Sequence, residues 1–244
     1  MKTIGIIPAR YGSTRLPGKP LKDICGRPMI WWVYERCKKS NKLNAVYVAT
    51  DDQRIVDACD FYKIPCLMTQ STHRTAANRL FEVSKKIDGD FYIQINGDEP
   101  LIDVTYIDEA IPEHIPLDYE YGTNIVCPIR DENQLNDISN IKVVFDNDGF
   151  IKYMSRNVIP YSYHDDKVIY YKHVGIIGYN KKMLDFYSES TPGVLELSEG
   201  IDTLRFIDYG KKLQAIKVEK YDSLSVDTEH DLEYVRNYME RMNG

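Results

Sequence analysis

The sequence predicts an α/β fold built on a doubly wound, mostly parallel sheet, and three observations support this. Short apolar runs typical of buried strands recur through the first half of the chain, beginning at residues 4–9. Segments with apolar residues at helical spacing stand between these runs. The connections are short, so strand and helix alternate, which is the order of a parallel sheet with helices on its faces.

The elements of the first half follow from hydrophobic periodicity. The expected strands are residues 4–9, 45–49, 66–69 and 90–95. The expected helices are residues 29–39, 53–62 and 77–86. Asp51 is expected to cap the second of these helices.

From residue 121 the pattern changes to strands joined by short turns. Strands are expected at residues 121–129, 142–146, 151–155, 172–179 and 213–218, with a hairpin turn at Asp-Asn-Asp-Gly, 146–149. Helices are expected at residues 181–188, 201–209 and 228–242. An antiparallel meander inserted into an α/β unit has exposed edges that pairing with a second copy would cover. We therefore expect a single domain, residues 1–244, with a β-rich dimerisation insert at about 121–180.

Composition narrows the class of partner. The net charge of −6 argues against a nucleic-acid partner, which would require a basic face, so an anionic substrate must be held by a local basic pocket. The five cysteines are odd in number and include no C-x-x-C pair. Because the chain enters a strand directly after Met1-Lys2, with no secretory segment and no membrane span, we expect a cytoplasmic protein with reduced thiols.

The loop after the first strand combines cations with glycines, namely Arg10, Gly12, Arg15, Gly18 and Lys19. Glycines let backbone N–H groups approach phosphate oxygens, and guanidinium and ammonium groups neutralise them, so the loop predicts polyphosphate binding. It is not a P-loop, because its glycines are one residue too far apart and a proline follows the lysine. The alternative is a solvated basic turn.

Two aspartates are candidates for a metal site. Asp98 follows the strand that ends at Ile95, at the edge of the sheet where ligands of open α/β folds bind. Its alternative role is to cap the next segment. For Asp227 the alternative is equally weighted, because Thr228 and Asp231 have the spacing of a variant capping box for the final helix.

Residues 8–21, Pro-Ala-Arg-Tyr-Gly-Ser-Thr-Arg-Leu-Pro-Gly-Lys-Pro-Leu, resemble the signature loop of the sugar-activating cytidylyltransferases. The resemblance is greatest to the 3-deoxy-manno-octulosonate (Kdo) cytidylyltransferases, or CMP-Kdo synthetases. It continues in order along the chain, through residues 26–30, 48–51, 97–100, 155–160, 173–175 and 226–228. It implies a fold of the nucleotide-diphospho-sugar transferase type and a homodimer formed through the insert.

The resemblance also implies an activity and a set of site residues. The activity is transfer of CMP from CTP to a 2-keto-3-deoxy sugar acid, releasing pyrophosphate, with Mg²⁺ as cofactor, for lipopolysaccharide, capsule or another cell-surface polysaccharide. The implied catalytic residues are Arg10, Lys19, Asp98 and Asp227, the two aspartates also holding the metal. The implied nucleotide-binding residues are Ala9, Arg10, Ser13, Arg15, Lys19, His73, Arg79 and Asp98. The implied sugar-binding residues are Asn96, Arg156, His173, Asp202 and Thr203.

Several departures from the family pattern cluster in the segments implied to contact the sugar. The usual Ser-Gly-Thr-Glu/Asp-Arg is Thr-Ala-Ala-Asn-Arg at 75–79, and the usual Leu-Glu-Gln-Leu-Arg is Ile-Asp-Thr-Leu-Arg at 201–205. Asn96 replaces a glutamine and Ile177 an aromatic residue. These changes predict a cytidylyltransferase whose acid differs from Kdo, such as an amino-modified Kdo or a larger nonulosonate, and they bear on the preference for CTP.

Two other classes are set against this reading. A GT-A-like glycosyltransferase shares the sheet but carries an Asp-x-Asp metal motif, where this chain has Asp98-Glu99-Pro100. A noncatalytic relative would keep the fold and lose the cations or carboxylates, and these are present here.

Overall fold

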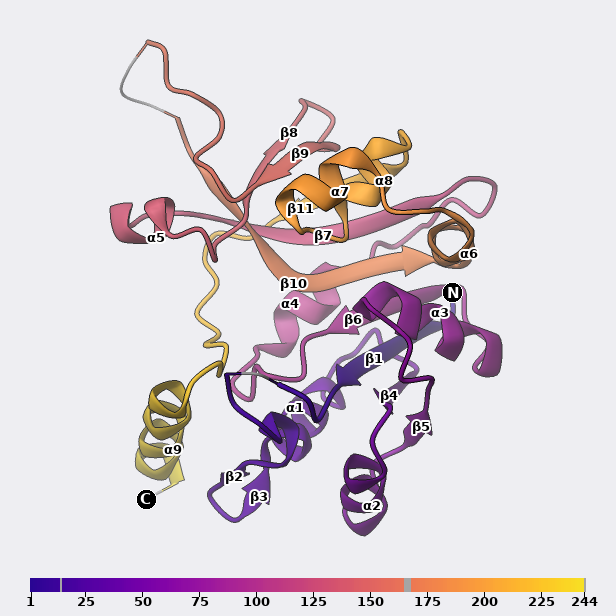
Figure 1. The fold of residues 1–244 in the computed structure, drawn as a ribbon, viewed down its shortest axis with the longest axis vertical. Coiled ribbons are helices and arrows are strands. Elements are labelled where there is room, and N and C mark those ends of the chain that lie inside the picture. Colours follow the sequence, from indigo (N-terminus) through magenta and orange to yellow (C-terminus); the bar gives the residue numbers. More distant parts are fainter. Residues whose placement is uncertain (14, 165–167, 244) are drawn as a thin grey trace. The chain divides into compact units, whose positions relative to one another are not determined.

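A computed structural model describes residues 1–13, 15–164 and 168–243 of the chain (Figure 1). Thr14, which belongs to the loop motif, lies outside the described residues. The chain forms two compact units, Met1–Asp108 with Asp222–Gly244, and Glu109–Tyr221. The expectation of one domain with an insert at about 121–180 stays a prediction.

The first unit is built on a parallel sheet. Its strands are β1 (Thr3–Ala9), β4 (Ala45–Thr50), β5 (Cys66–Met68) and β6 (Phe91–Ile95). They run in the order β6, β1, β4, β5, and every pairing between them is parallel. The side chains of β1 are almost all buried, as the apolar run predicts.

Helices α1 (Met29–Cys37), α2 (Gln53–Phe61) and α3 (Ala76–Lys86) connect these strands, while α4 (Val104–Glu109) follows β6 and α9 (Glu229–Asn243) ends the chain. The short elements η1 (Lys19–Leu21), β2 (Asp23–Ile24) and β3 (Arg27–Pro28) follow the first loop. The alternation of strand and helix predicted for this half is thereby confirmed.

The expected cap of α2 is wrong by one residue. Asp52, not Asp51, is the N-cap, and its Oδ1 accepts a hydrogen bond from the backbone N–H of Arg54 at 3.0 Å. Asp51 pairs instead with Arg79. Asp51 and Asp52 both suit an N-cap by residue type. Asp51 does not cap the helix because its carboxylate is paired with Arg79 of α3.

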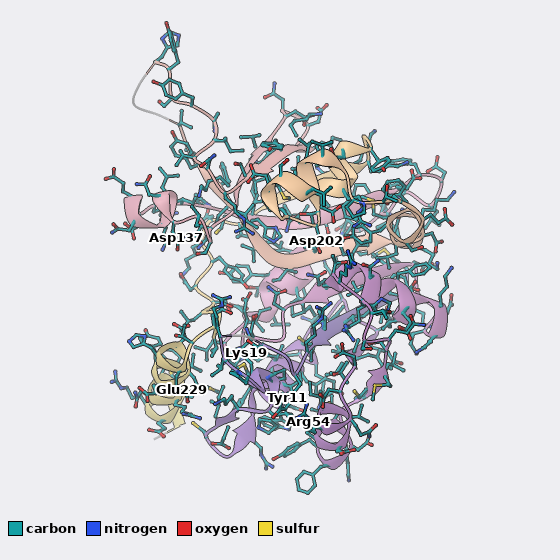
Figure 2. All side chains as sticks on the ribbon, in the orientation of Figure 1. Tyr11, Lys19, Arg54, Asp137, Asp202 and Glu229 are labelled. Carbon is teal, nitrogen blue, oxygen red and sulfur yellow. The ribbon has the colours of Figure 1, made fainter. Side chains whose placement is uncertain are left out.

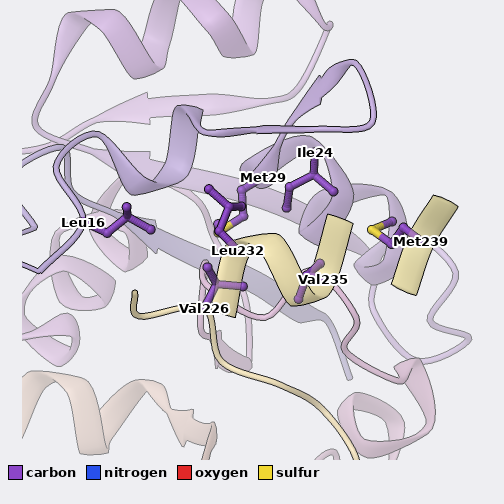
Figure 3. Packing of buried hydrophobic residues seen from close by; sticks show 7 residues of the cluster. All are labelled: Leu16, Ile24, Met29, Val226, Leu232, Val235 and Met239. Atoms are coloured by element: carbon purple, nitrogen blue, oxygen red, sulfur yellow. The ribbon is translucent and has the colours of Figure 1, made fainter. Parts of the chain in front are cut away.

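A hydrophobic cluster joins the two ends of the chain within the first unit. Its buried members are Leu16, Ile24, Met29, Val226, Leu232, Val235 and Met239 (Figure 3). Leu232, Val235 and Met239 recur at helical spacing, so α9 presents an apolar face to the first loop and to α1. Beside this cluster the backbone N–H of Val226 donates to the carbonyl of Asp98 at 2.8 Å. This packing fixes where the following residue, Asp227, lies.

The second unit contains the expected antiparallel meander. Its strands are β7 (Tyr121–Pro128), β8 (Lys142–Phe145), β9 (Ile151–Ser155), β10 (Tyr171–Asn180) and β11 (Lys212–Lys217). β8 pairs antiparallel with β9 and β10, β10 pairs antiparallel with β7, and β11 pairs parallel with β7. The hairpin turn is confirmed, because the N–H of Gly149, with φ +83°, donates to Asp146 O at 3.0 Å.

The helices of the second unit are shorter than expected in one place. They are α5 (Glu132–Asn136), α6 (Lys181–Glu189), α7 (Val194–Glu199) and α8 (Leu204–Asp208). Only Leu204–Asp208 of the helix expected at 201–209 forms, with Thr203 at its N-cap, and the preceding helix α7 ends at Gly200, which has a left-handed φ of +64°. Together the units confirm a mixed α/β fold with a mostly parallel sheet. In the part of the chain that the structure describes, every helix is too short or too polar to traverse a bilayer.

Candidate active site

The candidate residues of the first unit gather at the carboxyl ends of its strands. Ala9, the last residue of β1, lies opposite Thr50, the last residue of β4. β6 runs parallel to β1 on the other side and ends at Ile95. The residues that follow these strands therefore share one edge of the sheet, where open α/β folds bind ligands.

Lys19 lies at the centre of the charged residues at this edge. Its Nζ is 2.7 Å from Asp98 Oδ2 and 3.0 Å from Asp227 Oδ1, so one ammonium bridges two carboxylates (Figure 2 labels Lys19). Burial lowers the pKa of Lys19, but the charges and hydrogen bonds of Asp98 and Asp227 outweigh it and leave the pKa raised. Arg15 also contacts Asp227 Oδ1, at 3.0 Å. The structure thus brings together the cations of the loop and two aspartates distant in sequence.

The shape of the loop depends on Tyr11 and Gly18. Gly18 has φ +67°, and a Cβ there would lie 3.1 Å from the ring of Tyr11. Its N–H donates to Tyr11 O at 3.0 Å, which closes the loop just before Lys19 begins η1. The guanidinium of Arg54 stacks on the Tyr11 ring, 3.3 Å from its centroid (Figure 2). Glycine is needed here for both its positive φ and the close approach of the ring.

A cavity of about 290 Å³ opens beside Lys19. Its lining residues are Pro8, Ala9, Arg10, Gly12, Ser13, Lys19, Pro20, Ala76, Arg79, Gly97 and Asp98. Six of the eight residues predicted to bind nucleotide are among them. The exceptions are Arg15, which is bound to Asp227, and His73.

Two arginines, Arg10 and Arg79, line the cavity. Arg79 is fully buried, with its guanidinium 3.0 Å from Asp51 Oδ2 and donating to the hydroxyl of Thr69. Burial lowers the pKa of Arg10, and the charge of Arg79 lowers it further against the opposing effect of Asp51. The Nε of Arg79 is buried without a hydrogen-bond partner in the described part of the chain. Among the residues that the structure describes, only one of the two guanidiniums, that of Arg79, is paired with a carboxylate, so this part of the cavity favours an anion.

His73 contributes through its backbone. Its carbonyl accepts a hydrogen bond from Arg10, while its Nε2 lies 2.6 Å from Glu82 Oε2. Burial raises the pKa of Glu82, but hydrogen bonds from Lys86, Gln70 N–H and His73 outweigh it and lower the pKa to about 2. The segment before α3 is therefore anchored to that helix by an ionised carboxylate, and this anchors the carbonyl that binds Arg10.

Asp98 has the properties of a metal ligand. Its Oδ1 is buried and, among the described residues, has no hydrogen-bond partner. The described residues contain no group of three or more His, Cys, Asp and Glu side chains placed to hold a metal. A cation here would take one or two carboxylates and complete its coordination with phosphate oxygens and water, which is how Mg²⁺ is bound at nucleotide sites. The residues present fit such an ion.

The two readings of the segment at Asp227 are compatible. Asp231 accepts hydrogen bonds from Thr228 N and Oγ1, and Thr228 Oγ1 accepts one from Asp231 N, which confirms the variant capping box. The backbone N–H of Asp227 also donates to Asp231. The carboxylate of Asp227 takes no part in the cap and is directed to Lys19 and Arg15.

Arg156, predicted to bind the sugar, lies in the second unit at the end of β9. Its Nε donates to Glu199 O at 2.8 Å and its Nη1 to Ile138 O at 3.0 Å. Its backbone is held as well, because its N–H donates to Glu199 Oε2 and its carbonyl accepts from Lys142. The guanidinium is therefore fixed in place with donors to spare for an anion.

The other predicted sugar-binding residues differ in their burial and in their hydrogen-bond partners. His173 on β10 bonds through Nδ1 to Asn124 Oδ1 at 2.7 Å. Thr203 is buried and its hydroxyl donates to the sulfur of Met154. Burial, and after it the negative charge of Glu196, raises the pKa of the Asp202 carboxyl. Asn96, in the first unit, directly follows β6.

Sequence reasoning missed two residues that position the candidates. Asn124 is fully buried in β7, where an amide within a mostly apolar strand is the signal that could have identified it. Glu199, which holds Arg156, carries no comparable signal, since an acidic residue at the end of a short helix is ordinarily solvated.

A parallel α/β sheet whose carboxyl edge assembles cations, a carboxylate pair and a basic cavity defines a nucleotide-dependent transferase. The family model described as Cytidylyltransferase matches residues 4–213. The 3-deoxy-manno-octulosonate cytidylyltransferase of Fusobacterium nucleatum is 38% identical over 100% of this chain and 99% of its own length. The chain therefore belongs to the cytidylyltransferase family, among the relatives of the 3-deoxy-manno-octulosonate enzymes.

Two further similarities agree with this. An 8-amino-3,8-dideoxy-manno-octulosonate cytidylyltransferase of Shewanella frigidimarina is 38% identical over 95% of this chain and 96% of its own. A solved structure of a CMP:2-keto-3-deoxy-manno-octonic acid synthetase in complex with CTP has a TM-score of 0.91 and 35% identity, covering 99% of this chain and 100% of its own. The chain is thus a nucleotidyltransferase, which decides against the glycosyltransferase and noncatalytic readings.

Proposed function

We propose that the protein transfers CMP from CTP to a 2-keto-3-deoxy sugar acid of the Kdo type, giving a CMP-sugar and pyrophosphate. The observation that carries the proposal is the bridge from Lys19 to Asp98 and Asp227 beside a basic cavity. The names of the relatives and the CTP complex of the similar structure support the nucleotide and the class of acid.

The roles of the first-unit residues follow from where they lie. Ala9 and Ser13 line the cavity, where they would contact the nucleotide, and Arg10 and Arg79 supply its positive wall. Arg15 and Lys19 would bind the β- and γ-phosphates, exchanging aspartate oxygens for phosphate oxygens. His73 supports Arg10 through its carbonyl.

Asp98 and Asp227 would hold a Mg²⁺ ion, and the unpartnered Oδ1 of Asp98 supports this. When bound, the ion would neutralise phosphate charge and polarise the α-phosphate. The anomeric hydroxyl of the sugar acid would attack the α-phosphorus in line and lose its proton to solvent. The new P–O bond would form as the bond to the departing pyrophosphate breaks. The chain's own contribution is to position both substrates and to neutralise charge.

The sugar acid would be bound by Asn96, Arg156, His173, Asp202 and Thr203. Arg156 supports recognition of the carboxylate, since its guanidinium is fixed by backbone carbonyls and keeps donors free of those bonds. The substitutions at 75–79 and 201–205 support an acid that differs from Kdo, and 8-amino-Kdo is a candidate because relatives at equal identity act on it.

A direct assay tests the proposal. Purified protein is mixed with CTP, Mg²⁺ and either Kdo or 8-amino-3,8-dideoxy-Kdo, and pyrophosphate release is followed. We expect release that depends on both CTP and the acid, with kcat/KM higher for the preferred acid. Absence of release with either acid and with a nonulosonate would refute the activity. If kcat/KM for Kdo is high and at least equal to that for the other acid, only the proposed change of specificity is refuted.

We further propose that two copies pair through the second unit and that the protein works in the cytoplasm. Large apolar side chains of this unit are exposed, among them Tyr161, Tyr163 and Ile169. A groove of about 710 Å³ lies beside Ile169, and its other lining residues are Pro128, Ile129, Arg130, Val168, Tyr171, Lys217, Val218 and Glu219. The cysteines are free thiols, as a reducing compartment requires. Light scattering at micromolar concentration would show twice the chain mass if the pairing is correct.

A further inference from the structure

An irregularity in β10 places a buried amide next to His173. The pairing of β10 with β7 shifts between His173 and Ile177. Asn124 of β7, fully buried at this point, donates through Nδ2 to Val174 O at 2.8 Å and to Ile176 O at 3.2 Å. The side chain of Asn124 thus makes hydrogen bonds to β10 where the register of the ladder changes.

These two bonds determine which way the amide points. A backbone carbonyl can only accept a hydrogen bond, so the NH₂ group of Asn124 must face Val174 and Ile176, and its oxygen must face away from them. The oxygen lies 2.7 Å from Nδ1 of His173. A flipped amide would set one oxygen against two carbonyl oxygens, so this orientation is fixed by chemistry.

The orientation of the amide in turn fixes the proton on His173. Because Asn124 Oδ1 can only accept, Nδ1 of His173 must carry a hydrogen. Burial lowers the pKa of His173 to about 4, so the imidazole is neutral near pH 7 and bears a single N–H. Nε2 is therefore left with its lone pair, and it forms no hydrogen bond with any residue the structure describes.

We infer that Asn124 is a positioning residue that holds His173 as the Nδ1–H tautomer, so that Nε2 accepts a hydrogen bond from a hydroxyl or amino group of the sugar acid. The inference rests on the proposed function, which assigns His173 to sugar binding. The inference adds one detail to the proposed function: the substrate group that faces Nε2 of His173 is a hydrogen-bond donor. A fluoro or keto group there, which only accepts, would be bound poorly.

Nitrogen NMR of the wild-type protein tests the tautomer without relying on catalysis. The protein is labelled with ¹⁵N-histidine, long-range proton–nitrogen spectra are recorded at pH 7, and His173 is assigned by its loss in His173→Gln. We expect a protonated Nδ1 and an unprotonated Nε2. A protonated Nε2 would overturn the inference.

Addition of substrate tests the ligand part. With CTP present and divalent ions chelated to prevent turnover, saturation with Kdo or its 8-amino analogue should shift the Nε2 signal of His173 as the lone pair accepts a hydrogen bond. An Nε2 signal unchanged at saturation by both acids would overturn this part.

A matched pair of variants tests the role of Asn124. In Asn124→Asp the carboxylate beside Nδ1 stabilises the imidazolium, so Nε2 gains a proton and KM for the sugar acid rises about five- to tenfold, the loss of roughly one hydrogen bond, with kcat less affected. Asn180→Asp is the control, because Asn180 is equally buried and bonds two carbonyls, Pro116 O and Tyr119 O, without touching His173. Its His173 signals should match those of the wild type.

The outcomes separate the inference from the proposed function. If Asn124→Asp leaves both the His173 signals and KM at wild-type values, Asn124 does not position the ring. If Asn124→Asp fails to fold, the wild-type spectrum decides alone. Failure of the proposed function would appear as no CTP-dependent pyrophosphate release with any acid, and the tautomer measurement would stand apart from it.

Discussion

The candidate residues of the two units are held in different ways. In the first unit, charged side chains bind one another, with Lys19 bridging Asp98 and Asp227. In the second unit, Arg156 is held by backbone carbonyls and His173 by a buried amide. A charge cluster can exchange its partners when a charged ligand arrives, whereas a side chain fixed by backbone groups presents one face. The first arrangement suits a polyphosphate, and the second suits recognition of a sugar.

The largest effect is expected from Asp98→Asn, which removes one charge from the exchangeable cluster. Turnover should fall at least about 100-fold, the scale of losing one strong electrostatic stabiliser. Steady-state pyrophosphate release measures it. Asp88→Asn, at an exposed carboxylate of the same unit, is the control and should keep normal turnover. Near-normal turnover in Asp98→Asn would remove Asp98 from the catalytic group.

The second prediction concerns the fixed residues. Arg156→Lys keeps the charge but cannot reproduce the planar set of bonds to Glu199 O and Ile138 O, so KM for the sugar acid should rise about tenfold while KM for CTP stays unchanged. Arg130→Lys, which loses one bond to Glu219 O at the surface, is the matched control. A rise in the KM for CTP instead would contradict the division of roles between the units.

The third prediction tests the shape of the first loop. Gly18 and Gly26 both have positive φ, at +67° and +79°, but only Gly18 has a ring, that of Tyr11, where a Cβ would go. Gly18→Ala should therefore lower the unfolding free energy by about 1–2 kcal/mol, more than Gly26→Ala, and raise KM for CTP. Urea denaturation of the two variants measures the difference. Equal losses would mean that contact with Tyr11 does not shape the loop.

Much of the first unit could be predicted because its signals are local. The apolar runs gave the strands, and the spacing of Gly and cations after β1 indicated a phosphate loop before any partner was known. Asp98 was recognisable from its place after a strand. Asp227 was an even choice between a helix cap and a metal ligand until the family resemblance was considered. Its position depends on α9 packing against the first loop, and its contact with Lys19 joins residues 208 positions apart.

The rest depends on which of several suitable residues the fold selects. Asp51 and Asp52 are equally good caps by type, and a partner on α3 decides between them. His73 was predicted from its side chain but binds Arg10 through its carbonyl, which residue type does not encode. The role inferred for Asn124 depends on an irregular register in β10, which is a property of strand pairing.

The smallest effect is expected at Glu82, which binds His73 and the N–H of Gln70 and so anchors the carbonyl that accepts from Arg10. The folded state lowers the pKa of Glu82 from 4.5 to about 2, so the unfolded state binds its proton first as the pH falls. Its stabilising contribution is fully present above about pH 4.5 and is lost as the pH falls towards 2. Glu82→Gln should therefore lower the unfolding free energy at pH 7, by about 1 kcal/mol, and the gap from wild type should narrow at pH 3. Urea midpoints at the two pH values measure it, with Asp88→Asn as the control. A gap of the same size at both pH values would show that the anchor depends on the shape of the Glu82 side chain and not on its charge.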